Sequence, residues 1–120
     1  MAYGLVIPAD GDIYIGDFDE NPLYKSLQKA VGGLIEVVPC RNLPEPFVMI
    51  CNEEGLLQDN ITVNPVASAF YGIEQHGQPI VGTVVILREE ETEEGAELAS
   101  LKKGDPQKIA DALERSLEIV

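Results

Sequence analysis

The residues best suited to chemistry in this sequence are two adjacent glutamates, Glu53 and Glu54, which follow a predicted strand. Carboxylates at the end of a strand can bind a metal ion or act as a general base. Asn52 precedes this pair, and Asn64 stands ahead of a predicted helix. These four side chains form the candidate ligand-binding site. The alternative is a structural turn at 52–55, in which asparagine and glycine supply the backbone geometry and the glutamates keep the turn hydrated.

Other reactive side chains are poorly placed for catalysis or metal binding. Cys40 and Cys51 have no CxxC spacing, and the sole histidine, His76, lies in a stretch rich in glycine and glutamine, so a four-ligand zinc site is not expected. No serine lies in a GxSxG frame. The sequence therefore predicts no catalytic residue, no metal site and no cofactor. We expect both cysteines to be reduced, buried thiols.

The chain is strongly acidic, with 21 Asp and Glu against 8 Lys and Arg and a formal net charge of −13. Such a surface repels phosphate, so direct nucleic-acid binding is not expected. Two segments hold eleven of the acids, five within 10–20 and six within 89–97. This density could imitate the phosphates of DNA and bind a DNA-binding protein. The simpler alternative is that the acids only keep a small protein soluble.

The N-terminal half predicts a hairpin followed by a helix. Residues 3–7 and 13–18 are short apolar or alternating runs on either side of a turn, which is typical of a β-hairpin. A helix is predicted over 22–31, with Asn21 as its N-cap and a proline at its first position. The glycine pair at 32–33 ends this helix, because a left-handed residue costs least at glycine. At least one of the two is expected to have a positive φ.

The middle of the chain predicts two strands and a short helix. The apolar runs at 34–38 and 47–51 are expected to pair in the antiparallel direction. The leucine pair at 56–57 is expected to return to the core. A helix is predicted over 65–71, because Asn64 followed by proline is a typical helix start.

The C-terminal part predicts the centre of the sheet and a final helix. Residues 80–87 are almost continuously apolar and β-branched, as expected for a central strand covered on both faces. The side chains expected to be most buried there are Val81, Val84 and Ile86. Segment 89–97 is expected to be a solvated acidic loop. Residues 98–120 form a C-terminal helical extension, whose apolar stripe packs on the domain or mediates a homo-oligomer.

These elements predict one α+β domain over residues 1–120, with a mixed, largely antiparallel sheet of about five strands packed with two or three helices. No apolar run approaches the ~18 residues that a membrane span needs. The N-terminal residues lack a basic segment and hold only a short apolar stretch, so no secretory signal is expected. We therefore expect a cytoplasmic protein with no membrane contact.

Four motifs resemble the pattern of one protein family. They read LQKAVGGLIEVV at 27–38, NEEGLL at 52–57, NPVA at 64–67 and IVGTVV at 80–85. In this order and spacing they resemble the family catalogued as domain of unknown function 3846, over about residues 3–88. The resemblance implies a small protein of a phage, plasmid or bacterial genome and assigns no catalytic residues. The region after 88 departs from the pattern.

The sequence favours a small acidic binding or accessory protein of phage or mobile-element origin, which binds a protein or a small ligand without catalysis. One alternative is an acidic DNA-mimic-type inhibitor of a host nucleic-acid-binding enzyme. Another is a small hydrolase or small-molecule-binding domain that uses Glu53 or Glu54. A deep pocket that contains both carboxylates would favour this last function.

Overall fold

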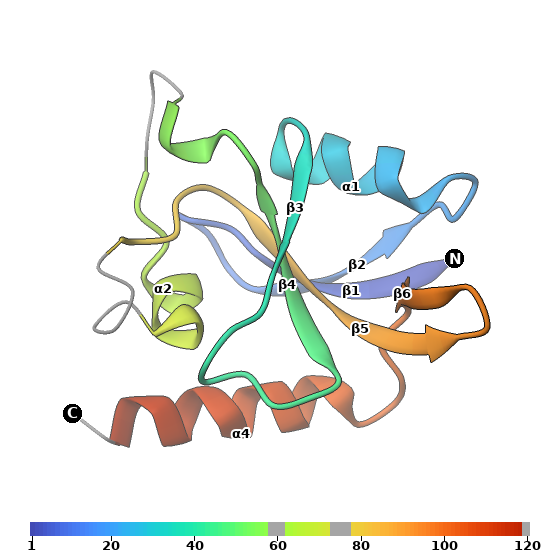
Figure 1. Ribbon diagram of the computed structural model, residues 1–120. Helices are drawn as coiled ribbons and strands as arrows, with labels where there is room; N and C mark the ends of the chain where they lie inside the picture. The colour runs from blue at the N-terminus through green and yellow to red at the C-terminus, as the bar shows by residue number, and fades with distance from the viewer. Residues whose placement is uncertain (58–61, 73–77, 119–120) are drawn as a thin grey trace.

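The computed structural model describes residues 1–57, 62–72 and 78–118 (Figure 1). His76 lies outside the described residues. The strands are β1 (Ala2–Ile7), β2 (Tyr14–Phe18), β3 (Ile35–Val38), β4 (Phe47–Asn52), β5 (Val84–Thr92) and β6 (Gly95–Ala99). The helices are α1 (Leu23–Val31), the short 3₁₀ helix η1 (Gly55–Leu57), α2 (Pro65–Tyr71) and α4 (Asp105–Glu118).

The six strands form one sheet in the order β2-β1-β5-β4-β3, and β6 pairs with the C-terminal part of β5. Every neighbouring pair is antiparallel. The predicted α+β class and the antiparallel pairing of β3 with β4 are confirmed. The sheet differs from the expectation of a mixed sheet in that no two of its described strands pair in the parallel direction.

Helices cover both faces of the sheet. On one face α1 packs against β4 and β5, and on the other face α2 and α4 pack together over a second core (Figure 1). β5 lies in the middle, and its first four side chains, Val84 to Leu87, alternate between the two cores and are fully buried. The prediction of a central strand covered on both faces is confirmed for 84–87. The predicted start at residue 80 is wrong, because β5 begins at Val84 after Gly82, which has φ 74°; Val81, at 8% exposure, is buried but lies outside the strand.

Helix α1 ends at the predicted glycine, but its N-cap is not the predicted residue. Gly32 has φ 85° and its N–H donates to the carbonyl oxygen of Gln28, which is a left-handed C-cap. The N-cap is Pro22, with no side-chain hydrogen bond, so the prediction that Asn21 caps the helix is wrong. The N–H of Asn21 instead donates to the carboxylate of Asp19, which holds the chain in a local turn before the helix.

The prediction that 89–97 is a solvated acidic loop is wrong. β5 runs on to Thr92, a turn follows, and β6 returns along it to form an exposed hairpin. Successive side chains of a strand point to opposite faces, which separates neighbouring glutamates more than their spacing in the sequence suggests. Glu90 lies directly opposite Glu97, and its carboxylate is within 3.4 Å of Arg88 and 3.5 Å of Lys102. Backbone pairing and these cations outweigh the local repulsion.

Two further expectations concern apolar side chains. Leu56 and Leu57 do not return to the core, since they are 47% and 81% exposed on η1. The C-terminal helix uses its apolar stripe within the chain, because Ile109 and Ala112 are buried in the core shared with α2. Leu117 at the end of the stripe is 59% exposed. A homo-oligomer through α4 stays a prediction.

Candidate functional site

A pocket of about 390 Å³ lies beside β3, at the edge of the sheet. Its wall comes from β3, from the turn that follows β4, from η1, from the last residue of α2 and from residues 78–81. The fold brings these segments together because β4 ends beside the start of β3, and Val63 and Val81 form an isolated bridge next to α2. The pocket is therefore assembled from segments far apart in the sequence.

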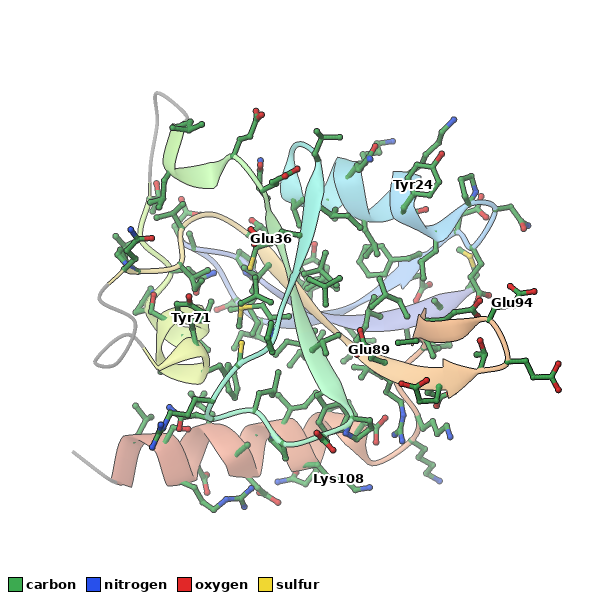
Figure 2. The ribbon with its side chains drawn as sticks, viewed as in Figure 1. Tyr24, Glu36, Tyr71, Glu89, Glu94 and Lys108 are labelled. Atoms are coloured by element: carbon green, nitrogen blue, oxygen red, sulfur yellow. The ribbon has the colours of Figure 1, made fainter. Side chains whose placement is uncertain are left out.

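The lining of the pocket combines carboxylates with apolar side chains. The polar members among the described residues are Glu36, Asn52, Glu53, Tyr71 and Gln78. The larger apolar members are Val37, Val38, Leu56, Leu57, Ile80 and Val81. Figure 2 shows Glu36 on β3 and Tyr71 on α2, well separated from Glu94 at the tip of the hairpin. This arrangement can hold an organic group that carries positive charge.

Of the four predicted site residues, Asn52 and Glu53 line the pocket and Glu54 does not. The structure thus places one carboxylate of the adjacent pair at the pocket, rather than both. Glu36 supplies the second carboxylate, from the strand opposite β4, where it faces Cys51 in the ladder. A pocket that contains both Glu53 and Glu54 would have favoured a small hydrolase or small-molecule-binding domain, and the lining of this pocket does not include both. That alternative stays a prediction.

Asn52 lines the pocket and also connects two elements through hydrogen bonds of its side chain. Its Nδ2 donates to the carbonyl oxygen of Val31 at 3.3 Å, and its Oδ1 accepts from the N–H of Glu54 at 2.9 Å. A Cβ on Gly33 would lie 2.9 Å from the Asn52 Nδ2. The glycine at this position therefore leaves room for the asparagine, which ties the end of α1 to the turn after β4.

Asn64 does not line the pocket, although its N–H donates to the carbonyl oxygen of Ile80, which does, and it is completely buried. Its Oδ1 accepts from the N–H of Ala67, which caps α2 as the sequence predicts. Its Nδ2 donates to the carbonyl oxygens of Ile7 at 2.9 Å and Gly82 at 2.8 Å. These contacts bind α2 to β1 and to the segment before β5, and they occupy the side chain within the protein.

The two thiols are free, Cys51 buried and Cys40 partly buried. Burial raises the pKa of Cys40 to about 12. Burial also raises the pKa of Cys51 to about 12, and the nearby Cys40 and Glu36 add to this rise. Both side chains are thus protonated at neutral pH and are poor nucleophiles. Within 1–57, 62–72 and 78–118, no three His, Cys, Asp or Glu side chains are grouped so that they could hold a metal ion.

The comparison with protein families adds the identity of the domain. The model of the family described as domain of unknown function (DUF3846) matches residues 1–114. The chain belongs to the DUF3846 family. The range predicted from the motifs, residues 3–88, is too short, because the family match also includes the β5–β6 hairpin and most of α4. No curated protein and no solved structure matches the chain.

The motifs that resemble the DUF3846 pattern contact one another in the fold and connect its elements. Gly33 of the first motif lies against the side chain of Asn52 in the second, and Asn64 of the third donates to the carbonyl oxygen of Gly82 in the fourth. A Cβ on Gly55 would lie 3.0 Å from Val81. The motifs therefore specify how helices and turns attach to the sheet, and the pocket lies where these attachments meet.

Glu36, Tyr71 and Gln78 are the polar pocket residues that the sequence did not predict. Glu36 is the polar residue in an otherwise apolar strand, LIEVV, and this exception was the available signal. Tyr71 ends a short helix and has no comparable signal. In the part of the chain that the structure describes, no helix combines the length and apolar character needed to cross a membrane.

Proposed function

We propose that this DUF3846 protein is a non-enzymatic binding protein, and that its β3 pocket holds a positively charged group carried on an apolar body. One observation carries the proposal: Glu36 and Glu53 line the same pocket, while its described lining contains no Lys, Arg or His. Neither carboxylate forms an ion pair within the described residues. An ammonium or guanidinium group can satisfy both through charge-assisted hydrogen bonds.

The size and the apolar lining of the pocket support the same class of ligand. A volume of about 390 Å³ lies at the small end of the range for ligand sites, which suits a small organic cation or one side chain of a partner. Leu56 and Leu57 are exposed at the pocket and provide apolar surface for the body of the ligand. The protonated Cys51 thiol supports binding rather than nucleophilic catalysis.

The experiment that tests this function is a nuclear magnetic resonance titration of the isotope-labelled protein with benzylamine. Benzyl alcohol, which has the same apolar body without the charge, is the matched control ligand. We expect saturable shifts of the pocket amides with the amine and much weaker binding of the alcohol. Equal binding of the two compounds, or amine shifts centred outside the pocket, would show that the carboxylates do not recognise a cation there.

Two substitutions separate the pocket from the general acidity of the surface. Glu36→Gln and Glu53→Gln should each weaken benzylamine binding by about fivefold, because each removes one charge-assisted hydrogen bond. Glu114→Gln removes the same charge from an exposed position on α4 and should leave the affinity unchanged. A loss of affinity of the same size in all three variants would point to nonspecific attraction and refute the pocket.

We further propose that the protein acts in the cytoplasm with both cysteines reduced. The support is that Cys40 and Cys51 are both free thiols, as is usual where glutathione keeps thiols reduced. Mass spectrometry of the intact protein, prepared without reductant, should give the mass of the dithiol form. A mass lower by two hydrogens would instead show that a disulfide forms.

A further inference from the structure

The opposite edge of the sheet is formed by β2, which pairs only with β1 among the described residues. A strand in an antiparallel sheet directs backbone N–H and C=O groups to both sides. The groups of β2 that point away from β1 therefore have no strand partner. Natural edge strands are commonly protected by charged side chains, especially lysine, by proline or by a bulge; the β2 sequence YIGDF contains no lysine or proline, and its one charged side chain is Asp17.

Large apolar side chains are exposed on both faces of this edge. Tyr14 is 55% exposed and the adjacent Ile15 is 46% exposed, and neighbouring strand residues point to opposite faces. Ile13 extends the apolar edge before β2 begins, at 44% exposure. Tyr3 of β1, at 47%, lies on the same face as Ile15, because Leu5 is opposite Ile15 in the register. An added strand would cover side chains on both faces at once.

The charge around this edge is mainly negative, and the one cation beside it, the N-terminal ammonium group of Met1, lies 3.1 Å from the carboxylate of Glu20. Five carboxylates lie within 10–20, and no Lys, Arg or His precedes Lys25. Asp17 is an exposed member of β2 itself. Lys102 follows Leu101, which hydrogen-bonds to Tyr3, but its ammonium group lies 3.5 Å from the Glu90 carboxylate. The edge therefore attracts a basic chain and repels an acidic one.

We infer that the β2 edge binds an extended, basic segment of a partner protein, which joins the sheet as an additional strand. The backbone of the segment pairs with the free groups of β2, its apolar side chains cover Tyr14 and Ile15, and its Lys or Arg side chains lie near the carboxylates of 10–20. A second copy of this chain is a poorer occupant, because two acidic edges would face each other. This site is independent of the pocket, which lies at the β3 edge.

The test uses a synthetic peptide of about seven residues that alternates lysine and valine, a length typical of one strand. Hydrogen exchange and amide chemical shifts of the labelled protein report where the peptide binds. We expect slower exchange and saturable shifts at 13–18, with affinity falling at least about tenfold when NaCl rises from about 50 mM to about 500 mM. The same peptide with glutamate in place of lysine should not bind.

Two matched substitutions decide whether the edge itself is the site. Ile15→Lys adds a positive charge to the β2 edge and should weaken peptide binding at least about fivefold. Leu117→Lys makes the same change at an exposed position on α4, outside both the β2 edge and the pocket, and should have no effect. Perturbation centred on β3, equal loss in both variants, binding of the acidic peptide, or self-association through β2 in sedimentation would each overturn the inference. None of these outcomes depends on benzylamine binding in the pocket.

Discussion

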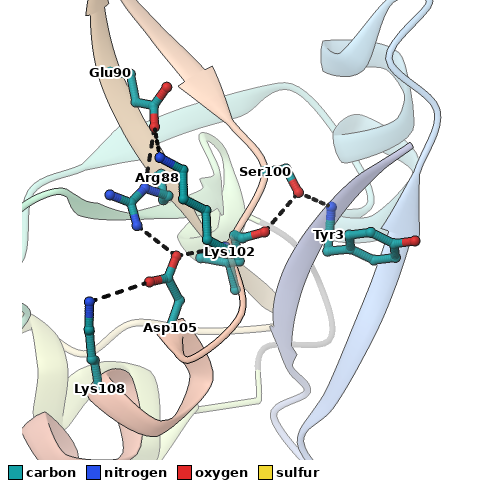
Figure 3. A network of polar contacts seen from close by, with 8 residues as sticks. Tyr3, Arg88, Glu90, Ser100, Lys102, Asp105 and Lys108 are labelled. Atoms are coloured by element: carbon teal, nitrogen blue, oxygen red, sulfur yellow. Dashed lines mark hydrogen bonds and ion pairs between the residues drawn. The ribbon is translucent and has the colours of Figure 1, made fainter.

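Asp105, the first residue of α4, is an acid with only 1% of its surface exposed. Its Oδ2 accepts a 2.8 Å hydrogen bond from the guanidinium group of Arg88 and a 2.7 Å bond from the N–H of Lys102 (Figure 3). Lys108 lies 4.0 Å from its other oxygen. Arg88 also stacks over Phe47, at 5.8 Å from the ring centroid. This network attaches the start of α4 to the middle of β5.

The contacts of Asp105 have a consequence for its ionisation. Burial alone would raise the pKa of Asp105, but the hydrogen bonds from the Lys102 N–H and from Arg88, together with the charges of Arg88 and Lys108, lower it below its ordinary value. An aspartate with a lowered folded-state pKa stabilises the fold at all pH values above the unfolded pKa of about 3.9. This contribution is lost as the pH falls through the folded-state pKa.

We predict that Asp105→Asn lowers the free energy of unfolding by about 3 kcal/mol at neutral pH, because it leaves Arg88 without its buried partner. The difference between parent and variant should shrink below about pH 4, where the parent loses the same charge. Urea unfolding at neutral and acid pH measures both quantities. Glu114→Gln, an exposed change in the same helix, is the control and should change stability little at either pH. A pH-independent difference for Asp105→Asn would contradict the ion-pair explanation.

At the scale of elements, the end of α1 depends on backbone geometry that only glycine adopts freely. Gly32 has φ 85°, and a Cβ there would meet no atom within 4 Å. Any cost of a substitution at this position is therefore conformational rather than steric. At Gly33 the constraint is steric, because the side-chain amide of Asn52 occupies the space that a Cβ would need.

We predict that Gly32→Ala lowers the free energy of unfolding by about 1 kcal/mol through backbone strain. Gly33→Ala should destabilise the protein by a different route, by displacing Asn52 from the carbonyl oxygen of Val31. Thermal melts of the two variants measure the effects, and the amide resonance of Asn52 should move only in the second. If both variants melt like the parent but lose a ligand, the glycines belong to function instead.

At the scale of the whole molecule, the net charge of −13 means that folding brings like charges together. The two acidic segments also approach each other: β2 ends beside the start of β1, and Leu101, just after the acidic hairpin, donates to the carbonyl oxygen of Tyr3 (Figure 1). The exposed carboxylates repel one another through solvent, where salt screens them, whereas the enclosed Asp105 and Arg88 are screened much less.

We predict that raising NaCl from about 50 mM to about 500 mM increases the midpoint of thermal unfolding by about 3 °C, because screening relieves the repulsion. The measurement is a thermal melt at constant pH. The Asp105→Asn variant should show the same increase, which separates general screening from any effect of salt on the buried ion pair. A midpoint that falls with salt would mean that exposed ion pairs contribute more to stability than the repulsion removes.

Local patterns determined much of this protein. Asn64 and Pro65 defined the start of α2 and Gly32 the end of α1, because caps and turns depend on neighbouring residues. The unbroken apolar run before Arg88 indicated a strand covered on both faces, since burial on both sides leaves no position for a polar side chain. The motifs also identified the family, although the match is longer than they indicated.

Only the tertiary structure decided the rest, because strand pairing and pockets depend on residues that are distant in the sequence. The glutamates after Arg88 belong to a hairpin because β6 supplies the backbone partners that a local reading of charge does not include. Asn64 is buried and connects α2 to the sheet because its side chain donates to carbonyl oxygens of β1 and of Gly82. The second carboxylate of the pocket is that of Glu36 on β3, and not that of Glu54, although Glu54 is adjacent to Glu53 in the sequence. The pocket is formed by segments that are distant in the sequence, so sequence neighbours need not share it.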